Sequence, residues 1–372
     1  MKQKARSPHK IKKNQIFDAS YVFIDGPNTS GKSSIGPIIS SFKRTEHFIM
    51  NHSYNQFLAL YKSGDLNKQG FKYLFEGELK KDIWYRMMGR EMNTNLHDIS
   101  SIIGSPRYKE YIARANRKDT TNIFNEIIKE INKKNLIFPF MSGDDLTTVS
   151  SVLNEINKKF KYIIVMRHPL DLVFSYFLSG RTTRLGTDPR YNKPAFKIKK
   201  FENVPQAMLD MPEKYSSASP LEKSFLFIEK QLLEYMNSDL LYSKNSCLVP
   251  FENYCVETKK YIKIFENFLG TSRTKFTNKE MIKANFPRKK DNDTFSKKAN
   301  IIFDNIGEKY SRRLKNLCER YEDEISDVYK LNSIKNYSKG KFKGLSIDEY
   351  SKVSDKKYLK GKFKNLSVNA LS

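Results

Sequence analysis

The sequence predicts an α/β fold in which a parallel β-sheet is flanked by helices on both faces and carries helical insertions. Three observations support this class. A glycine-rich loop near residue 30 lies between a short apolar run and a helical pattern. Strand patterns then alternate with helical patterns along most of the chain, which is typical of parallel sheets. Hydrophobic residues make up 39% of the 372 residues, enough for a substantial core.

The first predicted elements are a strand at 20–25 and a helix at 32–43, on either side of the sequence DGPNTSGKSS. Four residues separate Gly26 from Gly31-Lys32-Ser33, and this spacing fits the P-loop pattern. Such a loop directs backbone N–H groups inward at a helix N-terminus, where the helix dipole also favours an anion. We therefore expect the loop to bind a phosphate compound.

The remaining elements follow from hydrophobic periodicity. Residues 44–134 are mainly helical in pattern, because apolar residues recur there at steps of three and four. Further strands are predicted at 135–145 (interrupted by Pro139), 161–166 and 246–251, and further helices at 147–160, 168–180, 220–237, 255–269 and 299–330. Residues 181–218 show no strong period, and this segment is long enough to be a lid or binding loop. A further loop is predicted at 271–298.

The charge of the chain is uneven along its length. The net charge is +26, and we expect one domain at 18–330 between a basic extension at 1–17 and a basic tail at 331–372. The first 13 residues hold six basic and no acidic residues, and residues 333–372 hold ten lysines and three acids. The tail repeats KGKFKGLS as KGKFKNLS. Such ends either contact polyanions or are simply solvated lysine-rich segments.

Composition also restricts the class of protein. The three cysteines cannot pair completely and show no metal-ligand spacing, and the five histidines show none either. The N-terminus lacks the apolar region of a signal peptide, and no run approaches the ~20 apolar residues of a membrane span. We therefore expect a cytoplasmic protein with no transmembrane segment and no metal site.

A second group of candidate site residues lies in the sequence IIVMRHPLDLVFSYF. A buried strand ends at Arg167, a helix begins at Pro169, and Ser175 lies eight residues after the arginine. An arginine offers a planar fork of donors that matches phosphate oxygens, and a serine hydroxyl adds a neutral donor. In this strand–helix context the chain resembles the PAPS-dependent sulfotransferases. In that family an arginine and a serine so placed bind the 3′-phosphate of 3′-phosphoadenosine 5′-phosphosulfate (PAPS).

Three later segments are similar to the same family in the same order: SCLVPFENY, YIKIFENFLG and NFPRKKDND. In the last segment, Arg288 and Lys289 match the pair that closes over the 3′-phosphate and the adenosine. Lys290 stands where the family usually has a glycine. The resemblance covers roughly residues 18–330.

The resemblance implies transfer of a sulfuryl group from PAPS, as co-substrate, to a hydroxyl or amine acceptor without a metal. The 5′-phosphosulfate would then be bound by the P-loop residues Asn28, Thr29, Ser30, Gly31, Lys32, Ser33 and Ser34. The loop departs from the family's Pro-Lys-Ser-Gly-Thr-Thr type, because Thr29 takes the place of its lysine. Lys32, at the position used by nucleotide kinases, is expected to neutralise charge on the leaving phosphate instead.

Sulfuryl transfer also needs a general base for the acceptor proton. The first candidates are Asp144 and Asp145, which follow the strand predicted at 135–145, although Asp145 alternatively caps the next helix. Rival candidates in the helical insertion are His52, Glu76 and Glu78. His168, directly after Arg167, is expected to be structural.

The acceptor site would be lined by the insertions 44–134 and 181–218. Their aromatic and basic side chains are compatible with a carbohydrate acceptor: Tyr54, Trp84, Tyr85, Arg86, Arg181 and Arg184. An alternative function is a P-loop kinase using ATP and Mg²⁺ with Ser33 as a ligand. Against it, the strand at 161–166 is followed by arginine rather than by the aspartate such an enzyme needs. A third reading is a non-enzymatic protein that binds polyanions through its tails.

Overall fold

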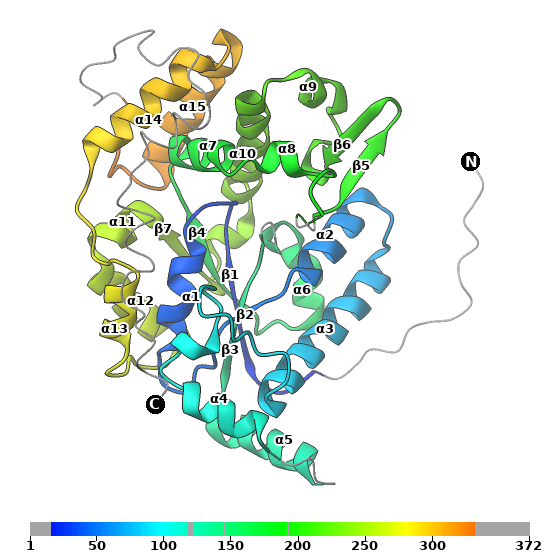
Figure 1. Ribbon diagram of the computed structural model, residues 1–372, viewed down its shortest axis with the longest axis vertical. Helices are drawn as coiled ribbons and strands as arrows, with labels where there is room; N and C mark the ends of the chain where they lie inside the picture. The colour runs from blue at the N-terminus through cyan, green and yellow to red at the C-terminus, as the bar shows by residue number, and fades with distance from the viewer. Residues whose placement is uncertain (1–15, 118–121, 144–145, 190, 192, 332–372) are drawn as a thin grey trace.

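The computed structural model describes residues 16–117, 122–143, 146–189, 191 and 193–331 (Figure 1). Its five-stranded sheet is parallel throughout and has the strand order β2-β3-β1-β4-β7. The strands are β1 (Ser20–Asp25), β2 (Ile49–Met50), β3 (Ile137–Met141), β4 (Lys161–Met166) and β7 (Ser246–Pro250). The α/β class predicted from the sequence is confirmed, and the strand that precedes the P-loop is the central one.

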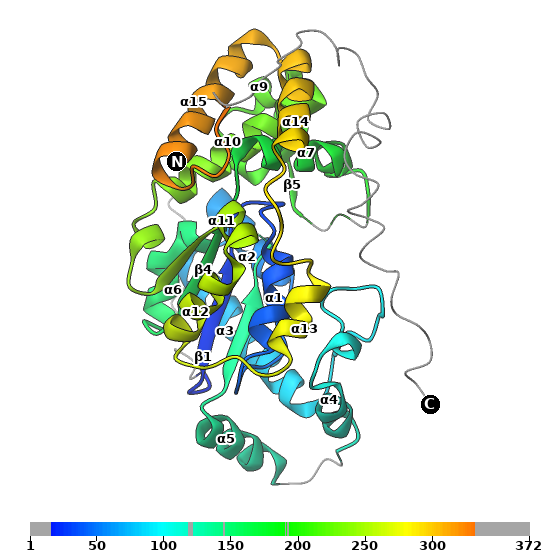
Figure 2. The same ribbon diagram turned by 90° about the vertical axis from the view of Figure 1, so that its left-hand side faces the viewer.

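Helices cover both faces of this sheet because side chains alternate between the faces along each strand. Val22 and Ile24 of β1 lie in the core formed with α1 (Lys32–Ser40), α12 (Thr258–Leu269) and α13 (Thr277–Lys283). Tyr21 and Phe23 lie in the opposite core with α3 (Lys68–Met88) and α6 (Ser150–Ile156). Figure 1 shows the sheet between these two groups, and Figure 2 views it from the side of α12.

A further group of helices lies beyond the carboxyl ends of the strands. The chain passes from β4 directly into α7, and Figure 1 shows α7, α10, α14 and α15 together at that end of the molecule. The other helices of the domain are α2 (Ser53–Ser63), α4 (Tyr108–Ala115), α5 (Ile123–Lys134), α7 (Pro169–Leu178), α10 (Pro220–Met236), α11 (Phe251–Val256), α14 (Asn292–Asn305) and α15 (Glu308–Glu324). The 3-10 turns are Ile102–Gly104, Leu146–Val149, Gln206–Met208 and Asp239–Tyr242.

Pro139 does not interrupt β3, contrary to the sequence prediction. Ile137, two residues earlier, donates its N–H to the carbonyl of Arg44, away from β1. The backbone of Pro139 faces the same side as that of Ile137, away from β1, because residues two apart in a strand have the same orientation. The N–H that proline lacks therefore removes no hydrogen bond to β1. On the other side, β2 pairs only with the two residues that follow Pro139. The short β2 itself is a strand inside the range 44–134, which was predicted to be helical.

The segment 181–218 is also more regular than predicted. It contains α8 (Arg181–Arg184), a hairpin of β5 (Ala195–Ile198) and β6 (Phe201–Pro205), and α9 (Pro212–Ser217). The hairpin turn is formed by two lysines, with Lys199 at φ 53°. The Asn-Gly or Asp-Gly pair that normally indicates such a turn is absent, so the sequence pattern did not reveal it.

Several predicted boundaries were wrong near the C-terminal part of the domain. The segment 271–298 is not a loop, since it contains α13 and the first turns of α14. Asp291 caps α14 by accepting a hydrogen bond from the Thr294 N–H at 2.9 Å. The helix predicted at 255–269 is interrupted at Glu257, and the helical stretch predicted at roughly 299–330 consists of the end of α14 and of α15. The helix predicted at 32–43 ends at Ser40.

Parts of the sequence prediction lie outside the described residues, among them most of the basic extension and the repeat-bearing tail. Of the helices that are described, none combines the length and the apolar composition needed to cross a bilayer.

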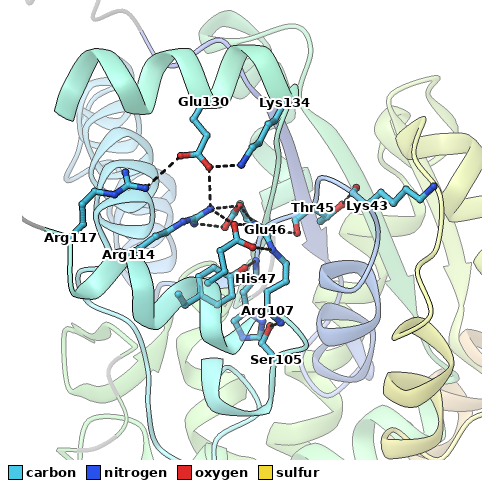
Figure 3. A network of polar contacts seen from close by, with 12 residues as sticks. Lys43, Thr45, Glu46, His47, Ser105, Arg107, Arg114, Arg117, Glu130 and Lys134 are labelled. Carbon is cyan, nitrogen blue, oxygen red and sulfur yellow. Dashed lines mark hydrogen bonds and ion pairs between the residues drawn. The ribbon is translucent and has the colours of Figure 1, made fainter. Parts of the chain in front are cut away.

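A network of ion pairs around the buried Glu46 connects the outer helices α4 and α5 to the edge of the sheet (Figure 3). Glu46 is fully buried and accepts hydrogen bonds from Arg114 Nη1 at 2.8 Å and Arg107 Nη2 at 2.9 Å. Arg107 also donates to the carbonyl of Thr45 at 2.8 Å. Burial alone would raise the pKa of Glu46, but the two guanidinium groups outweigh it and lower this pKa to about 2. Glu130 of α5 completes the network with an ion pair of 3.8 Å to Arg114.

We predict that Glu46→Gln lowers the free energy of unfolding at pH 7 by ~3–5 kcal/mol, because the buried guanidinium of Arg114 and the half-buried one of Arg107 lose the charge of their shared buried partner. The lowered pKa of Glu46 means that its ionised form stabilises the fold above pH ~4.5 and that this contribution is lost as the pH falls toward 2. The difference between wild type and variant should therefore narrow over that range in urea titrations. Glu308→Gln, at an exposed ion pair of 3.8 Å, is the control and should change stability by less than ~0.5 kcal/mol. A Glu46→Gln variant as stable as this control would contradict the prediction.

Candidate functional site

The P-loop between β1 and α1 is held in shape by two close backbone contacts. Gly26 has φ 142°, and a Cβ at this residue would lie 2.1 Å from the carbonyl oxygen of Val165. Gly31 has φ 97°, and a Cβ there would lie 2.3 Å from the ring of Phe251. Only glycine fits both the backbone angle and the space at these two positions. The loop thus lies directly against β4 and the start of α11.

Lys32 connects the loop to Gly143, two residues after the end of β3. Its side chain is buried, and Nζ donates to the carbonyl oxygens of Gly26, of Pro27 at 3.4 Å and of Gly143 at 2.7 Å. The ammonium group therefore lies between the P-loop and the stretch in which the sequence places the candidate bases.

The other loop residues have distinct surroundings. Asn28 accepts a hydrogen bond from Arg181 Nη1 at 2.6 Å, and its N–H donates to Gln231 of α10 at 3.3 Å. The fully buried hydroxyl of Ser30 finds no hydrogen-bond partner among the residues described. A buried hydroxyl in this state is unfavourable, so it fits a loop that receives an oxygen atom from a ligand. Ser33 and Ser34 lie in the first turn of α1, and Ser34 donates both its N–H, at 3.0 Å, and its hydroxyl, at 2.6 Å, to the carbonyl of Gly31.

Arg167 extends from the end of β4 toward the loop. Its Nη1 donates to the carbonyl of Thr29 at 3.1 Å, and its Nη2 lies 3.5 Å from Asp171 of α7. Lys298 of α14 pairs with the other oxygen of Asp171 at 2.7 Å. Burial would raise the pKa of Asp171, but Arg167 and Lys298 outweigh it and hold this pKa below its usual range. Ser175 lies one turn further on the same face of α7, since residues four apart in a helix are neighbours.

Arg288 also lies beside the Phe251 ring. The guanidinium carbon of Arg167 lies 5.2 Å from the centre of this ring, and that of Arg288 lies 5.7 Å from it. The backbone N–H of Arg288 donates to the carbonyl of Cys255 at 2.7 Å, which ties its loop to α11. Lys289 is exposed on that loop. The structure thus brings three sequence-predicted segments together around one aromatic ring.

A buried polar cluster fixes the junction between β4 and α7. The backbone N–H of His168 donates to Glu252 at 2.7 Å, and the Tyr321 hydroxyl donates to the second oxygen of Glu252 at 2.8 Å. The His168 ring caps α7 by accepting from the Leu170 N–H at 3.3 Å. Its Nε2 lies 3.1 Å from Glu322, so the proton sits on Nε2. His168 is therefore a buried part of the framework next to Arg167, which agrees with the structural place expected from the sequence.

The candidate bases are only partly placed by the structure. Asp144 and Asp145 lie outside the described residues. His52 and Glu78 line one cavity at the end of β2, whereas Glu76 is buried and lines neither of the two cavities described below. Sequence reasoning missed Asp82, which lines the same cavity as Glu78; the signal would have been its spacing of four residues from Glu78 along α3.

The larger cavity, here called the α3 cavity, has a volume of about 350 Å³. It is lined by Phe48, Ile49, Met50, Asn51, His52, Ser53, Glu78, Lys81, Asp82, Tyr85, Arg86, Arg90, Glu91, Asn93 and Ser100. Asn51 donates to Glu78 at 2.7 Å and to Asp82 at 3.0 Å, and Tyr54 donates to Asp82 at 2.7 Å. Burial is the main reason why the pKa of Asp82 is raised to about 6. The wall is therefore polar and rich in both signs of charge.

A smaller cavity of about 50 Å³ is lined by residues that include Tyr176, Tyr191 and Phe227. Asn55 of α2 also lines it and accepts a hydrogen bond from the Gly143 N–H at 3.1 Å. Since Gly143 also accepts from Lys32, this cavity is joined to the P-loop through two hydrogen bonds.

The side chains considered for a carbohydrate acceptor divide among different places. Tyr85 and Arg86 line the α3 cavity, while Trp84 packs on Phe124 with ring centres 5.3 Å apart. Tyr54 is buried in the core. Arg181 and Arg184 lie in the segment after α7, Arg181 next to the P-loop and Arg184 against the ring of Tyr191 at 5.5 Å.

Together, the fold and the site define an α/β protein with a glycine loop after its central parallel strand and two arginines gathered beside that loop. Among solved structures it is similar to the sulfotransferase domain from the curacin biosynthetic pathway, with a TM-score of 0.37, 10% identity and coverage of 91% of this chain and 99% of that one. It is also similar to a sulfotransferase from Alicyclobacillus acidocaldarius, with a TM-score of 0.34, 12% identity and coverage of 82% and 97%.

A third similar structure is a sulfotransferase from Mycobacterium avium, with a TM-score of 0.35, 9% identity and coverage of 83% of this chain and 77% of that chain. No family model matches the chain, and no curated protein matches it. At these TM-scores and identities the function proposed below rests on the residues of the site.

We predict that Gly31→Ala weakens binding of a nucleotide phosphate at the loop and lowers stability by ~2–4 kcal/mol, from left-handed backbone strain plus the clash with Phe251. Gly64 is a matched control, because it has φ 85° and a Cβ there would meet no atom of the described residues within 4 Å. Gly64→Ala should lose only the ~1–2 kcal/mol of backbone strain and retain nucleotide binding. Denaturant unfolding and calorimetry test both. Equal losses for the two variants would show that the Phe251 contact does not shape the loop.

Proposed function

We propose that this protein is a sulfotransferase that moves a sulfuryl group from PAPS to a hydroxyl or amine acceptor. The observation that carries the proposal is the convergence of Arg167 and Arg288 on the Phe251 ring, directly beside the P-loop. One phosphate-binding loop suits any nucleotide with a 5′-phosphate group. A second cationic site next to it suits a nucleotide that carries another phosphate at a distance from the first.

The charges of this second site support the same ligand. Arg167, Arg288 and Lys298 bring three positive charges, of which Asp171 balances one. Burial raises the pKa of the nearby Glu252, which disfavours its negative form. A 3′-phosphate would supply the remaining negative charge, with Ser175 as a neutral donor one turn along α7 and Lys289 at the rim.

The reaction assigns roles to the loop. The acceptor oxygen or nitrogen attacks the sulfur atom while the bond from sulfur to the bridging phosphate oxygen breaks, and the acceptor proton passes to a base. The N–H groups of 29–33, together with the side chains of Asn28, Ser30, Ser33 and Ser34, would hold the 5′-phosphate. Lys32 would neutralise the charge that develops on the leaving phosphate.

Asp144 and Asp145 remain the first candidates for the base, because Gly143 before them contacts Lys32. His52 and Glu78 of the α3 cavity are the second pair. The polar wall of this cavity suits a hydroxylated acceptor such as a carbohydrate.

A P-loop kinase is the second candidate function, since Ser33 stands where such enzymes bind Mg²⁺. Calorimetry with 3′-phosphoadenosine 5′-phosphate and with ATP–Mg²⁺, each with and without EDTA, discriminates between the two. Tight binding of the first ligand in EDTA supports the sulfotransferase. Binding of ATP alone, dependent on Mg²⁺, would establish the kinase instead.

For the donor site, we predict that Arg167→Gln weakens binding of 3′-phosphoadenosine 5′-phosphate by ~1.5–3 kcal/mol, about 10- to 150-fold, because a charge-assisted hydrogen bond is lost. Binding of adenosine 5′-phosphate, which lacks the 3′-phosphate, should hardly change. Calorimetry of both ligands on both proteins gives the comparison.

Arg312→Gln is the matched control for Arg167→Gln, since Arg312 is 79% exposed on α15. It should leave the affinities for both nucleotides unchanged. If Arg167→Gln weakens the two nucleotides equally, the arginine supports the fold and does not read the 3′-phosphate.

For the chemical step, we predict that Lys32→Ala lowers kcat by about 100-fold or more, the usual scale for removing one charge-stabilising group. Affinity for 3′-phosphoadenosine 5′-phosphate should fall much less, because the stabilisation peaks in the transition state. Single-turnover kinetics and calorimetry measure the two effects. Equal losses in rate and affinity would show that Lys32 only anchors the ground state.

The same two measurements identify the base. Asp144→Asn, Asp145→Asn, His52→Gln and Glu78→Gln are compared, and the base is the residue whose variant loses turnover while nucleotide affinity stays normal. If all four variants turn over normally, none of these residues accepts the proton.

A further inference from the structure

The α3 cavity contains a buried cation that no described residue neutralises by direct contact. Arg86 of α3 lines the cavity and is only 8% exposed. Among the described residues it makes no hydrogen bond or ion pair, and its Nη1 is sealed from solvent without a partner. The Tyr111 ring lies 5.8 Å from its guanidinium carbon. Burial lowers the pKa of Arg86, because a charged guanidinium is less favourable in this buried position than in water.

Such an arrangement is unusual, because a buried guanidinium is normally paired with a carboxylate. Arg114, at the same edge of the sheet, shows the ordinary situation, since it is buried to a similar degree and bonds Glu46 at 2.8 Å. A guanidinium without a hydrogen-bonding partner in the wall of a cavity matches the oxygens of a carboxylate or a sulfate.

The other residues that line the cavity indicate the chemistry of the rest of a ligand. Lys81 and Arg90 also line it, and Lys81 pairs with Glu78 at 2.6 Å. The cavity wall also contains the amide of Asn51 and the carboxyl groups of Glu78 and Asp82. Such groups form hydrogen bonds with hydroxyl groups. The volume of about 350 Å³ lies within the range for small-molecule sites and would admit one or two sugar rings.

The position of the cavity connects it to the acceptor side of the reaction. It opens at the carboxyl end of β2, two strands from β1 in the sheet and at the edge where parallel sheets bind ligands. α2 begins at this point, and Asn55 in its first turn bonds Gly143, the partner of Lys32. The cationic site of Arg167 and Arg288 lies on the opposite side of β1, where β4 and β7 end.

We propose that the α3 cavity binds an oxyanion of the acceptor, a carboxylate or a sulfate group, through Arg86. The acceptor is accordingly an acidic, hydroxylated molecule such as a uronic acid or a sulfated sugar. The term acceptor rests on the sulfotransferase function proposed above, whereas the oxyanion site itself does not.

The experiment is an NMR titration of the full chain with glucuronate, glucose and inorganic sulfate, with and without saturating 3′-phosphoadenosine 5′-phosphate to fill the donor site. Wild type should bind glucuronate at least tenfold more tightly than glucose. Arg86→Met should abolish this difference, while Arg312→Met, which removes an exposed arginine from α15, should retain it. Competition by sulfate for the glucuronate site identifies the shared oxyanion chemistry, and binding of glucuronate without such competition restricts the site to carboxylates.

Thermal unfolding separates a ligand site from a structural role. Arg86→Met should have the melting temperature of wild type or a higher one, because no ion pair is lost. If this variant does not fold, Arg86 is structural and the proposal is overturned. Lys81→Met at the same cavity provides an independent variant and should weaken glucuronate binding several-fold.

Failure of this inference can be distinguished from failure of the proposed function. If glucuronate and glucose bind wild type equally while 3′-phosphoadenosine 5′-phosphate binds normally, the oxyanion site is wrong and the sulfotransferase proposal stands. If glucuronate binds through Arg86 but the nucleotide does not bind, the cavity is an oxyanion site in a protein of another function.

Discussion

The contact between Gly31 and the ring of Phe251 is the constraint on which the proposed donor site depends. The ring leaves no space for a side chain at Gly31, so it fixes the P-loop relative to the end of β7. The same ring lies beneath the guanidinium groups of Arg167 and Arg288. One aromatic side chain therefore sets the spacing between a helix N-terminus and two cations. Because the two phosphate groups of such a nucleotide are joined through one ribose, the distance between them varies only within limits, and the spacing of the two anion sites has to lie within those limits.

Buried carboxylates in this basic protein serve mainly to orient cations and the residues around them. Glu252 holds the backbone of His168 and the hydroxyl of Tyr321, which together fix the direction of Arg167 at the end of β4. Asp171 joins Arg167 to Lys298 of α14. Each contact connects an element at the carboxyl edge of the sheet to a helix from the C-terminal part of the chain. The cations of the donor site are thus preorganised before a ligand arrives, which lowers the reorganisation that binding requires.

How far the sequence could predict these features depends on how local their determinants are. The P-loop, the strands at 20–25 and 161–166, and the helix beginning at Pro169 follow from short patterns of glycine, proline and apolar residues. The hairpin after α7 was missed because Lys199 adopts a left-handed backbone without the usual turn residues. The convergence of the two arginines was expected only through a family resemblance, since their approach depends on the packing of Phe251. The spacing of four residues between Glu78 and Asp82 could have indicated Asp82, but its raised pKa arises from burial, which the sequence does not show.

Three arginines near β2, Arg86, Arg107 and Arg114, differ in how their charges are balanced. Glu46 has only two carboxylate oxygens, and Arg114 and Arg107 together bond both of them. Arg86 is near enough for the charge of Glu46 to raise its pKa, yet burial outweighs that effect and lowers it. The charges of Glu46 and Asp82 therefore favour the charged form of Arg86 without giving it a hydrogen-bonding partner among the described residues, and both oxygens of Glu46 already accept from Arg107 and Arg114. A guanidinium held in this way retains its donors for a molecule that enters the α3 cavity, and the network that stabilises α4 and α5 is also what leaves this site open.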